Sequence, residues 1–259
     1  MESRLAAPIE YTLPVGEARI PLNALLGQPL QLDWNGRIEC VHCGRTTRRS
    51  FGQGHCYPCF KTLASCDRCI VQPELCHYSV GTCREPAWGE QHCLIPHTVY
   101  LANSSGLKVG ITRGLDATTR WIDQGAAQAL PIRVVASRLE AGHVEVALKA
   151  HVSDRTNWRA MLRGQPPWLD LVHERDRLLG ELERAAGDTR LPGERPPDGP
   201  ATEIAYPIVA YPTKIVSHNL EKSPELSGTL LGIKGQYLIF DSVVINVRKY
   251  AGYWLRITV

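Results

Sequence analysis

The sequence predicts an α+β protein with antiparallel sheets, in which a cysteine-rich metal-binding segment and a small α/β core lie between two β-rich ends. All nine cysteines fall between Cys40 and Cys93, which marks that segment. The rest of the chain alternates apolar and polar residues as strands do, except where amphipathic helices interrupt it. These observations predict five parts: a β-rich start (1–39), the cysteine-rich segment (40–96), the α/β core (97–165), a charged helix with a Pro/Gly-rich linker (166–203) and a β-rich end (204–259).

The two ends of the chain share a strand-and-turn character. Near the start, "IEYTLPV" and "PLQLDWNGRIEC" alternate as strands, with Asn35 and Gly36 as a hairpin turn. The tail after residue 203 is a further run of strands and turns. We expect the two ends to share one β-barrel or sandwich.

The first cysteine group contains two CxxC pairs, "CVHC" and "CYPC", separated by twelve residues. Two residues between thiolates allow one tight turn to place both sulfurs on one ion, and two such turns complete a tetrahedron. An odd number of cysteines at this spacing indicates metal binding rather than disulfides. We therefore expect a structural zinc ion, as in a zinc ribbon, held by Cys40, Cys43, Cys56 and Cys59.

The second cysteine group combines one CxxC pair with three single cysteines, so it offers five thiols for four positions. A second structural zinc is the preferred interpretation, and an iron–sulfur cluster, which also needs four thiolates, is the alternative. Four protein ligands leave no open position for substrate on either metal. The expected ligands are Cys66, Cys69, Cys76 and Cys83, with Cys93 able to replace one of them.

A basic loop joins the two CxxC pairs of the first group. It reads "GRTTRRSFGQG" and carries Arg45, Arg48 and Arg49, with Phe51 available for stacking on bases. We expect these arginines to contact nucleic acid, since basic residues beside a zinc ribbon are a common binding surface. A solvated basic loop on a purely structural ribbon is the alternative.

Residues 97–165 predict a hairpin, a helix, a strand and a second helix, in that order. "VYLANSSGLKVGITR" gives two short strands around an Asn-Ser-Ser-Gly turn, and "GLDATTRWIDQGAAQAL" contains a helix. "PIRVVASR" is the third strand, and "LEAGHVEVALKAHVSD" has the apolar periodicity of an amphipathic helix. A long charged helix is expected over 168–186, and the Pro/Gly-rich stretch 187–203 predicts a linker or exposed loop.

This order of elements resembles the GIY-YIG nuclease superfamily over residues 97–160. "TVY", ending at Tyr100, stands where that superfamily has its first motif, and "KVG", beginning at Lys108, stands for the second. Arg120 matches the superfamily's helix arginine, and Glu145 matches its metal-binding glutamate on a later helix. The sequence departs from the pattern in two places: Lys108 replaces a tyrosine, as in the viral-type branch, and Arg120 lies about two residues later than usual.

The whole chain is similar to a bacterial family of unknown role, domain of unknown function 2797. The phrases that carry this likeness are "YPCF", "GTCREPAWGE", "VYLANSSGLKVGITR" and "RWIDQGA". This second resemblance assigns no activity.

The nuclease resemblance implies a metal-dependent cleavage of phosphodiesters. Tyr100 or a metal-bound water would be the base, with Lys108 as an alternative base that could also lower the pKa of the phenol. Arg120 would grip a phosphate oxygen through its planar fork, and Glu145 would hold Mg²⁺ or Mn²⁺. Arg113, at the end of its strand, would hold a neighbouring phosphate.

Composition and charge limit the other possibilities. The net charge is +3, but residues 97–165 hold nine Lys and Arg against five Asp and Glu, so the basic excess lies on the predicted core. No apolar run approaches the roughly 20 residues of a membrane span, and the N-terminus lacks the pattern of a secretory signal. We expect a cytoplasmic protein with a nucleic-acid partner. A non-catalytic nucleic-acid-binding module and an iron–sulfur protein are the alternatives, and protein partners stay open.

Overall fold

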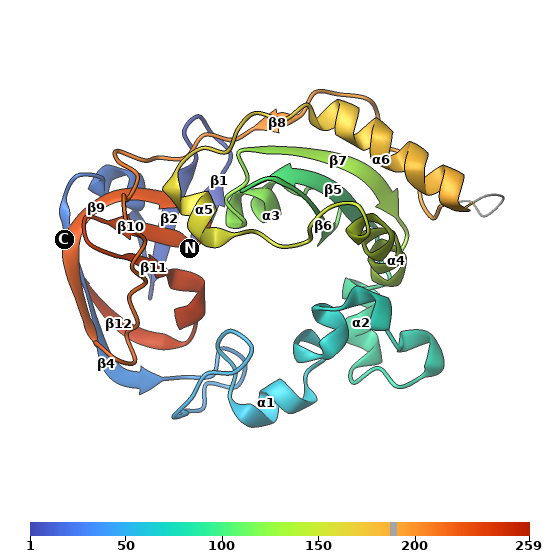
Figure 1. Cartoon of the computed structure of the whole chain (residues 1–259). Coiled ribbons are helices and arrows are strands. Elements are labelled where there is room, and N and C mark those ends of the chain that lie inside the picture. The colour runs from blue at the N-terminus through green and yellow to red at the C-terminus, as the bar shows by residue number, and fades with distance from the viewer. Residues whose placement is uncertain (187–190) are drawn as a thin grey trace. The chain divides into compact units, whose positions relative to one another are not determined.

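The computed structural model describes residues 1–186 and 191–259, and the chain divides into two compact units (Figure 1). The first unit contains residues 1–62, 162–164 and 204–259, and the second contains residues 63–161 and 165–203. Strands pair antiparallel in both units, and the helices and strands together make the predicted mixed α+β class. The predicted division into five parts stays a prediction. Among the described residues, no helix combines the length and the apolar character that a membrane crossing requires.

The first unit contains two sheets, one of three strands and one of five. The three-stranded sheet has the order β1-β2-β3, with β1 (Glu2–Arg4), β2 (Glu10–Val15) and β3 (Ala18–Pro21). The five-stranded sheet has the order β11-β10-β9-β4-β12, with β4 (Pro29–Ile38), β9 (Glu225–Lys234), β10 (Tyr237–Phe240), β11 (Val244–Asn246) and β12 (Tyr253–Thr258).

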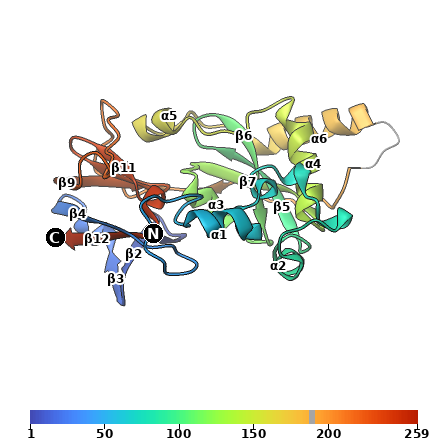
Figure 2. The same ribbon diagram turned by 90° about the horizontal axis from the view of Figure 1, so that it is seen from below.

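The two ends of the chain share the five-stranded sheet, because β4 pairs with both β9 and β12 (Figure 2). The blue start of the chain therefore lies beside its red end. The expectation of a barrel is wrong: in the described part of the chain, β11 and β12 are the two edges of an open sheet and do not pair with each other. The alternating pattern specified strands with one buried face, and that pattern is the same for an open sheet as for a closed one.

Asn35 and Gly36 lie inside β4 and do not form the expected hairpin turn. Against the partner strand, Tyr253 is opposite Ile38 and Leu255 is opposite Trp34, so β4 carries extra residues at this point. Gly36 takes a φ of 84°, the left-handed conformation that suits both a turn and a bulge. Because β4 pairs with β12 on both sides of this point, Gly36 belongs to an irregularity within one continuous strand and not to a turn.

The second unit contains the predicted hairpin, helix, strand and helix in the expected order. A four-stranded sheet of order β6-β5-β7-β8 is formed by β5 (His97–Asn103), β6 (Leu107–Arg113), β7 (Gln128–Val135) and β8 (Thr202–Glu203). The helices of this unit and the boundary helix α5 are α2 (Pro86–His92), α3 (Thr118–Asp123), α4 (Arg138–Lys149), α5 (Trp158–Arg163) and α6 (Leu171–Ala186).

The two faces of this sheet have different partners. Val99 and Leu101 share one core with Val144 on α4 and Leu178 on α6. Tyr100, between those two strand residues, points to the other face, where its ring packs edge-on against Trp121 of α3 at 6.1 Å. Helices α3 and α6 therefore lie on opposite sides of the sheet (Figure 1). The alternation of the strand thus separates the packing face from the face that carries the candidate site.

The stretch expected to be a linker is in part ordered against this sheet. Glu194 exchanges two backbone hydrogen bonds of 2.8 Å with Val134 of β7, and Thr202 and Glu203 pair with the same strand as β8. The proline and glycine residues indicated an irregular segment. This segment is nevertheless held in place, because it forms backbone hydrogen bonds with the edge of β7. Residues 187–190 of the predicted linker lie outside the described residues.

The cysteine-rich segment forms short turns instead of long elements. The first unit holds α1 (Tyr57–Thr62) and the second holds α2 and four 3-10 helices: η2 (Ala64–Cys66), η3 (Arg68–Ile70), η4 (Pro73–Leu75) and η5 (Tyr78–Val80). The first unit also holds the 3-10 helices η1 (Leu22–Leu25) and η6 (Val247–Tyr250).

Candidate functional site

The four cysteines of the first group converge on one point. The sulfurs of Cys40, Cys43, Cys56 and Cys59 all lie within 4.8 Å of one another, and the sulfurs of Cys43 and Cys56 are 3.7 Å apart. In a tetrahedron with zinc–sulfur bonds of about 2.3 Å, the sulfurs would be ~3.8 Å apart. The four thiols can therefore hold a zinc ion.

Backbone geometry prepares this group for a metal. The backbone N–H of Gly44 donates to the carbonyl of Cys40 at 2.9 Å, which closes the first tight turn, and Gly44 takes a φ of 70° that favours glycine. Burial alone would raise the pKa of the Cys40 thiol, but N–H groups from Cys43, Cys56 and His42 bond to its sulfur and lower that pKa to about 6. Such N–H groups also stabilise thiolates bound to zinc.

The thiol of Cys59 differs from that of Cys40 in the direction of its pKa shift. Its pKa is raised to about 12, first by burial and then by the thiols of Cys56, Cys43 and Cys40 around it. Four thiolates cannot share this volume without a cation, because like charges disfavour the charged form. A divalent ion removes that repulsion.

The basic loop between the two CxxC pairs of the first cysteine group is exposed. Arg45, Arg48 and Arg49 all have exposed side chains, and the guanidinium of Arg49 lies 5.4 Å from the centre of the Phe51 ring. Their expected contact with nucleic acid stays a prediction.

Four of the five cysteines in the second group line one small cavity in the second unit. These are Cys69, Cys76, Cys83 and Cys93, and Cys66 is not among the described residues that line it. Burial raises the pKa of the Cys69 thiol to about 11, with the charges of Asp67, Cys76 and Cys93 adding to the shift. Cys69, Cys76 and Cys93 are therefore close enough for the charge of one thiolate to shift the pKa of another.

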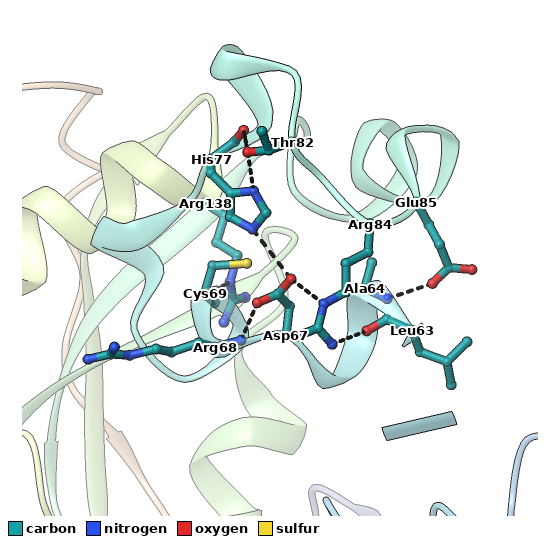
Figure 3. Close-up of polar contacts among 10 residues, drawn as sticks. All are labelled: Leu63, Ala64, Asp67, Arg68, Cys69, His77, Thr82, Arg84, Glu85 and Arg138. Carbon is teal, nitrogen blue, oxygen red and sulfur yellow. Dashed lines mark hydrogen bonds and ion pairs between the residues drawn. The ribbon is translucent and has the colours of Figure 1, made fainter. Parts of the chain in front are cut away.

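A polar cluster beside this cavity is centred on Asp67 (Figure 3). The Asp67 carboxylate lies 2.7 Å from the Arg84 guanidinium and 3.3 Å from Nε2 of His77, and His77 Nδ1 is 2.8 Å from the Thr82 hydroxyl. Asp67, Cys69 and His77 also lie close enough together to hold a metal ion.

Three of the residues that resemble a nuclease site, Tyr100, Lys108 and Arg120, lie on the α3 face of the second unit's sheet, whereas Glu145 lies on α4, which packs on the opposite face. Gln124, just after α3, links two of them: its amide nitrogen donates to the Tyr100 hydroxyl, and its amide oxygen accepts from the Lys108 ammonium. Lys108 also donates to the hydroxyl of Thr156 at 3.2 Å. Gly110, opposite Tyr100 on β6, has no room for a side chain, because a Cβ there would lie 2.6 Å from the Tyr100 hydroxyl oxygen.

Burial shifts the pKa values of this network. Tyr100 is fully buried, and burial raises the pKa of its phenol although the Arg120 charge and the bond from Gln124 oppose the shift. Burial and the charge of Arg120 lower the pKa of Lys108 to about 8. Lys108 can therefore lose its proton near neutral pH, whereas Tyr100 keeps its own.

Arg120 and Glu145 act on this network from different positions. Arg120 is exposed on α3, and its guanidinium lies close enough to influence both Tyr100 and Lys108. Glu145 is mostly buried on α4, where its carboxylate lies 3.4 Å from the Lys149 ammonium, and burial raises its pKa. Its charge also reaches Tyr100 and Lys108.

Arg113 is placed away from these residues, next to the second cysteine group. Its Nε donates to the carbonyl of His92 at 3.0 Å, and its guanidinium lies 5.6 Å from the centre of the Trp88 ring. The charge of Arg113 acts on the thiol of Cys93. The structure thus gives Arg113 a local role, and its expected contact with a phosphate stays a prediction.

Gln124 and Thr156 belong to this network but were not among the site residues predicted from the sequence. Gln124 follows Arg120 by one helical turn, and this spacing places both on the side of α3 that faces the hairpin. That spacing could have indicated Gln124. Thr156 lies in the loop after α4, and no periodicity reports on its position.

The chain matches the family described as "Protein of unknown function (DUF2797)" over residues 27–255. Comparison with curated proteins and comparison with solved structures each gave no match.

Proposed function

Because the chain belongs to the DUF2797 family, described as proteins of unknown function, we propose its function from its own residues. The proposed function is metal-dependent hydrolysis of phosphodiester bonds in nucleic acid by a zinc-containing protein. We further propose that it works in the cytoplasm, where a reducing environment keeps the thiols available to metal.

One observation carries this proposal: a lysine with a pKa of about 8 is hydrogen-bonded through Gln124 to a buried tyrosine, beside an exposed arginine. A general base works best when its pKa lies near the working pH. Phosphodiester cleavage also needs positive charge where the phosphate oxygens gain negative charge. Lys108 and Arg120 supply these two requirements. The order of elements in the second unit gives further support, because it is the order that resembles the GIY-YIG superfamily.

We assign the proton transfer to Lys108 in preference to Tyr100. The neutral Lys108 amine accepts a proton from the attacking water, whose oxygen forms a bond to phosphorus while the bond to the leaving sugar oxygen breaks. The leaving oxygen takes a proton from solvent. Tyr100, which keeps its proton, orients Gln124 and through it the amine.

Arg120 and Glu145 have supporting roles in the proposal. Arg120 binds a non-bridging phosphate oxygen from its exposed position on α3. Mg²⁺ or Mn²⁺ would stabilise the charge on the phosphate when bound, and Glu145 is the carboxylate that would hold it. To bind the metal ion, the Glu145 carboxylate has to give up part of its ion pair with Lys149.

The nucleic-acid partner is supported by the first zinc group. Arg45, Arg48 and Arg49 form an exposed basic loop, and Phe51 beside them offers an aromatic ring. Arginine and aromatic side chains together suit single-stranded nucleic acid, which presents both phosphates and bases.

The experiment is a cleavage assay of DNA and RNA with Mg²⁺ or Mn²⁺, combined with a binding measurement on the same substrates. We expect Glu145→Gln and Lys108→Met to reduce the cleavage rate at least 100-fold, the lower end of what a catalytic acid or base contributes. Binding should stay within a few-fold of the unmodified protein. Arg155→Gln is the matched control: Arg155 is an exposed arginine in the same unit, and its loss should leave cleavage unchanged.

A non-catalytic nucleic-acid-binding module is the second candidate. The full burial of Tyr100 and the ion pair between Glu145 and Lys149 favour it, since both features close the site. This candidate predicts binding without cleavage of any substrate, and binding that survives Glu145→Gln and Lys108→Met unchanged.

A further inference from the structure

We propose that Asp67, Cys69 and His77 hold a second zinc ion, in addition to the zinc of the first cysteine group. This inference does not depend on the proposed nuclease activity. The ligand atoms of the three side chains all lie within 4.8 Å of one another. A carboxylate oxygen, a thiolate sulfur and an imidazole nitrogen are the three kinds of side-chain atom that bind zinc. We call these three residues the mixed-ligand site.

Two short turns of the second unit bring the three side chains together. Asp67 caps the start of η3, Cys69 lies within η3, and His77 caps the start of η5. Figure 3 shows the Cys69 sulfur next to both the His77 ring and the Asp67 carboxylate. Each of these 3-10 helices has only three residues, and such turns contribute little stability of their own. A metal ion that joins η3 to η5 would stabilise this segment.

The contact between Asp67 and His77 has the geometry of two ligands on one zinc ion. Oδ2 of the Asp67 carboxylate lies 3.3 Å from Nε2 of the His77 ring. With zinc–nitrogen and zinc–oxygen bonds of about 2.0–2.2 Å, two ligands of a tetrahedral zinc are ~3.4 Å apart. A direct hydrogen bond between a charged nitrogen and a carboxylate is shorter, about 2.7–2.9 Å. The observed separation therefore fits a shared metal ion better than a direct hydrogen bond.

The hydroxyl of Thr82 orients the His77 ring for metal binding. It lies 2.8 Å from Nδ1 of the ring, and it donates its own hydrogen to the backbone carbonyl of His77 at 3.4 Å. The hydroxyl oxygen is then the acceptor for the N–H at Nδ1. This leaves the lone pair on Nε2, the nitrogen that faces Asp67. Histidine ligands of zinc characteristically donate their other ring N–H to a partner of this kind.

Hydrogen bonds from outside the site hold the two anionic ligands. Oδ2 of Asp67 lies 2.7 Å from Nε of Arg84, and Oδ1 accepts from the backbone N–H of Arg68 at 2.5 Å. On the other side, Nε of Arg138 donates to the backbone carbonyl of Cys69 at 3.2 Å. Carboxylates that bind metals are ordinarily hydrogen-bonded in this way. The turn that carries both ligands is therefore fixed without the use of the Cys69 sulfur.

The fourth position of the zinc ion opens into the cavity beside these residues. Asp67, Cys69 and His77 all line this cavity, and its volume of about 10 Å³ is close to what one water molecule needs. Among the described residues, no four thiols of the second cysteine group lie within 4.8 Å of one another, so the expected four-thiol centre is not assembled. An iron–sulfur cluster, which also needs four thiolates, is disfavoured for the same reason. We therefore assign the fourth position to water.

The test is the zinc content of the full chain and of single variants, measured by elemental analysis. The unmodified protein should contain two zinc ions per chain, and Asp67→Ala, Cys69→Ala and His77→Ala should each lose one of them. Cys76→Ser should keep both, because Cys76 lines the cavity but is not a ligand. The matched control is His173→Ala, which removes an exposed histidine of α6 in the same unit and should also keep both.

Three results would overturn the assignment: one zinc in the unmodified protein, two in His77→Ala, or loss of one in Cys76→Ser. The last result would show that a thiol of the cavity lining takes the fourth position or replaces the histidine. Two zinc ions in His77→Ala would show that His77 forms only an ion pair with Asp67.

A second measurement uses the unmodified protein and so avoids variants that fail to fold. X-ray absorption at the zinc edge reports the average ligand set of the two ions. The first cysteine group supplies four sulfurs and Cys69 supplies one more. We therefore expect five sulfur ligands and three nitrogen or oxygen ligands, shared by two zinc ions. Sulfur ligands alone, the result for two four-thiol centres, would contradict the mixed-ligand site.

Thr82→Val tests the orientation of the His77 ring while all three ligands stay in place. The affinity for the second zinc ion should fall about 10–100-fold in competition with a chelator, as is typical when the partner of a metal-bound histidine is removed. The affinity for the zinc ion of the first cysteine group should stay the same. An unchanged affinity for both zinc ions would contradict the role given to His77.

Discussion

At the scale of single residues, burial shifts the pKa values of polar side chains at the candidate site. Tyr100 and Lys108 could be selected from the sequence because of their places in the two strands. Their burial could not, since it depends on how α3 packs on the sheet. The same holds for Gln124, whose amide joins the two residues only once the chain has folded.

His97 is a second buried polar residue, and it predicts a pH dependence of stability. Burial lowers the pKa of its imidazole to about 4, and the charges of Arg138 and Arg113 contribute. Its Nδ1 lies 2.8 Å from the carbonyl of Ile95, and its Nε2 has no hydrogen-bond partner among the described residues. The imidazole is therefore neutral in the fold.

The stability that His97 contributes should be complete above its unfolded pKa of about 6.5 and should fall as the pH decreases toward 4. The unfolded chain binds the proton in this range and the folded chain does not. The full loss is at most ~3.5 kcal/mol, because one pKa unit corresponds to about 1.4 kcal/mol. His97→Asn should flatten the change in unfolding free energy between pH 6.5 and 4 in denaturant titrations. An equal slope in both proteins would show that His97 is not responsible.

At the scale of elements, the long amphipathic helices were predictable and the short turns were not. Helices α4 and α6 have an apolar periodicity that requires no knowledge of their partners, and Leu178 is fully buried as that pattern predicts. Helix α2 and the 3-10 turns have no such periodicity, because the chain around the second cysteine group is arranged by its packing on α4. Gly142 marks this contact: a Cβ there would lie 2.5 Å from the backbone nitrogen of Glu74.

Two glycine-to-alanine substitutions should therefore have opposite effects on stability. Gly142→Ala should destabilise the protein by about 1–3 kcal/mol, since backbone atoms of Pro73 and Glu74 would have to move. Gly180→Ala, in α6, should stabilise it by up to ~1 kcal/mol, because nothing lies within 4 Å of the new Cβ and alanine favours a helix. Thermal or denaturant unfolding measures both. Equal effects of the two changes would contradict the close contact of η4 with α4.

At the scale of the whole molecule, the sequence predicted that the two ends of the chain share one β-structure, but it did not predict the order of the strands in it. The alternating residues of both ends indicated strands, and the structure places them in one sheet. Nothing in the pattern shows that β4 lies between β9 and β12, because register and order depend on contacts between distant strands. The loop of the first cysteine group contacts the turn between β11 and β12: Arg248 of η6 donates to the Gln53 side chain at 2.7 Å.

Removal of zinc should consequently loosen more than the loop that binds it. The backbone N–H of Glu39 donates to the carbonyl of Gly252 at 2.8 Å, and the Trp254 indole donates to the Glu39 carboxylate at 2.9 Å. Gly252 directly precedes β12 and Trp254 lies on it, while Cys40 directly follows Glu39. We expect a chelator to increase hydrogen exchange in residues 40–62 and in β12, and added zinc to reverse the change. Exchange confined to residues 40–62 would show that the sheet is independent of the metal.

The proposed role of Lys108 is tested most directly by the pH dependence of single-turnover cleavage, measured with protein in excess over a DNA or RNA substrate and with Mg²⁺ or Mn²⁺ present. The rate should rise with pH and level off above a pKa of about 8, because the amine must lose its proton to act as a base. Lys108→Arg keeps the positive charge but cannot be deprotonated, so it should remove this rise together with most of the rate. Absence of cleavage by the unmodified protein, or an unchanged rise in Lys108→Arg, would contradict the account.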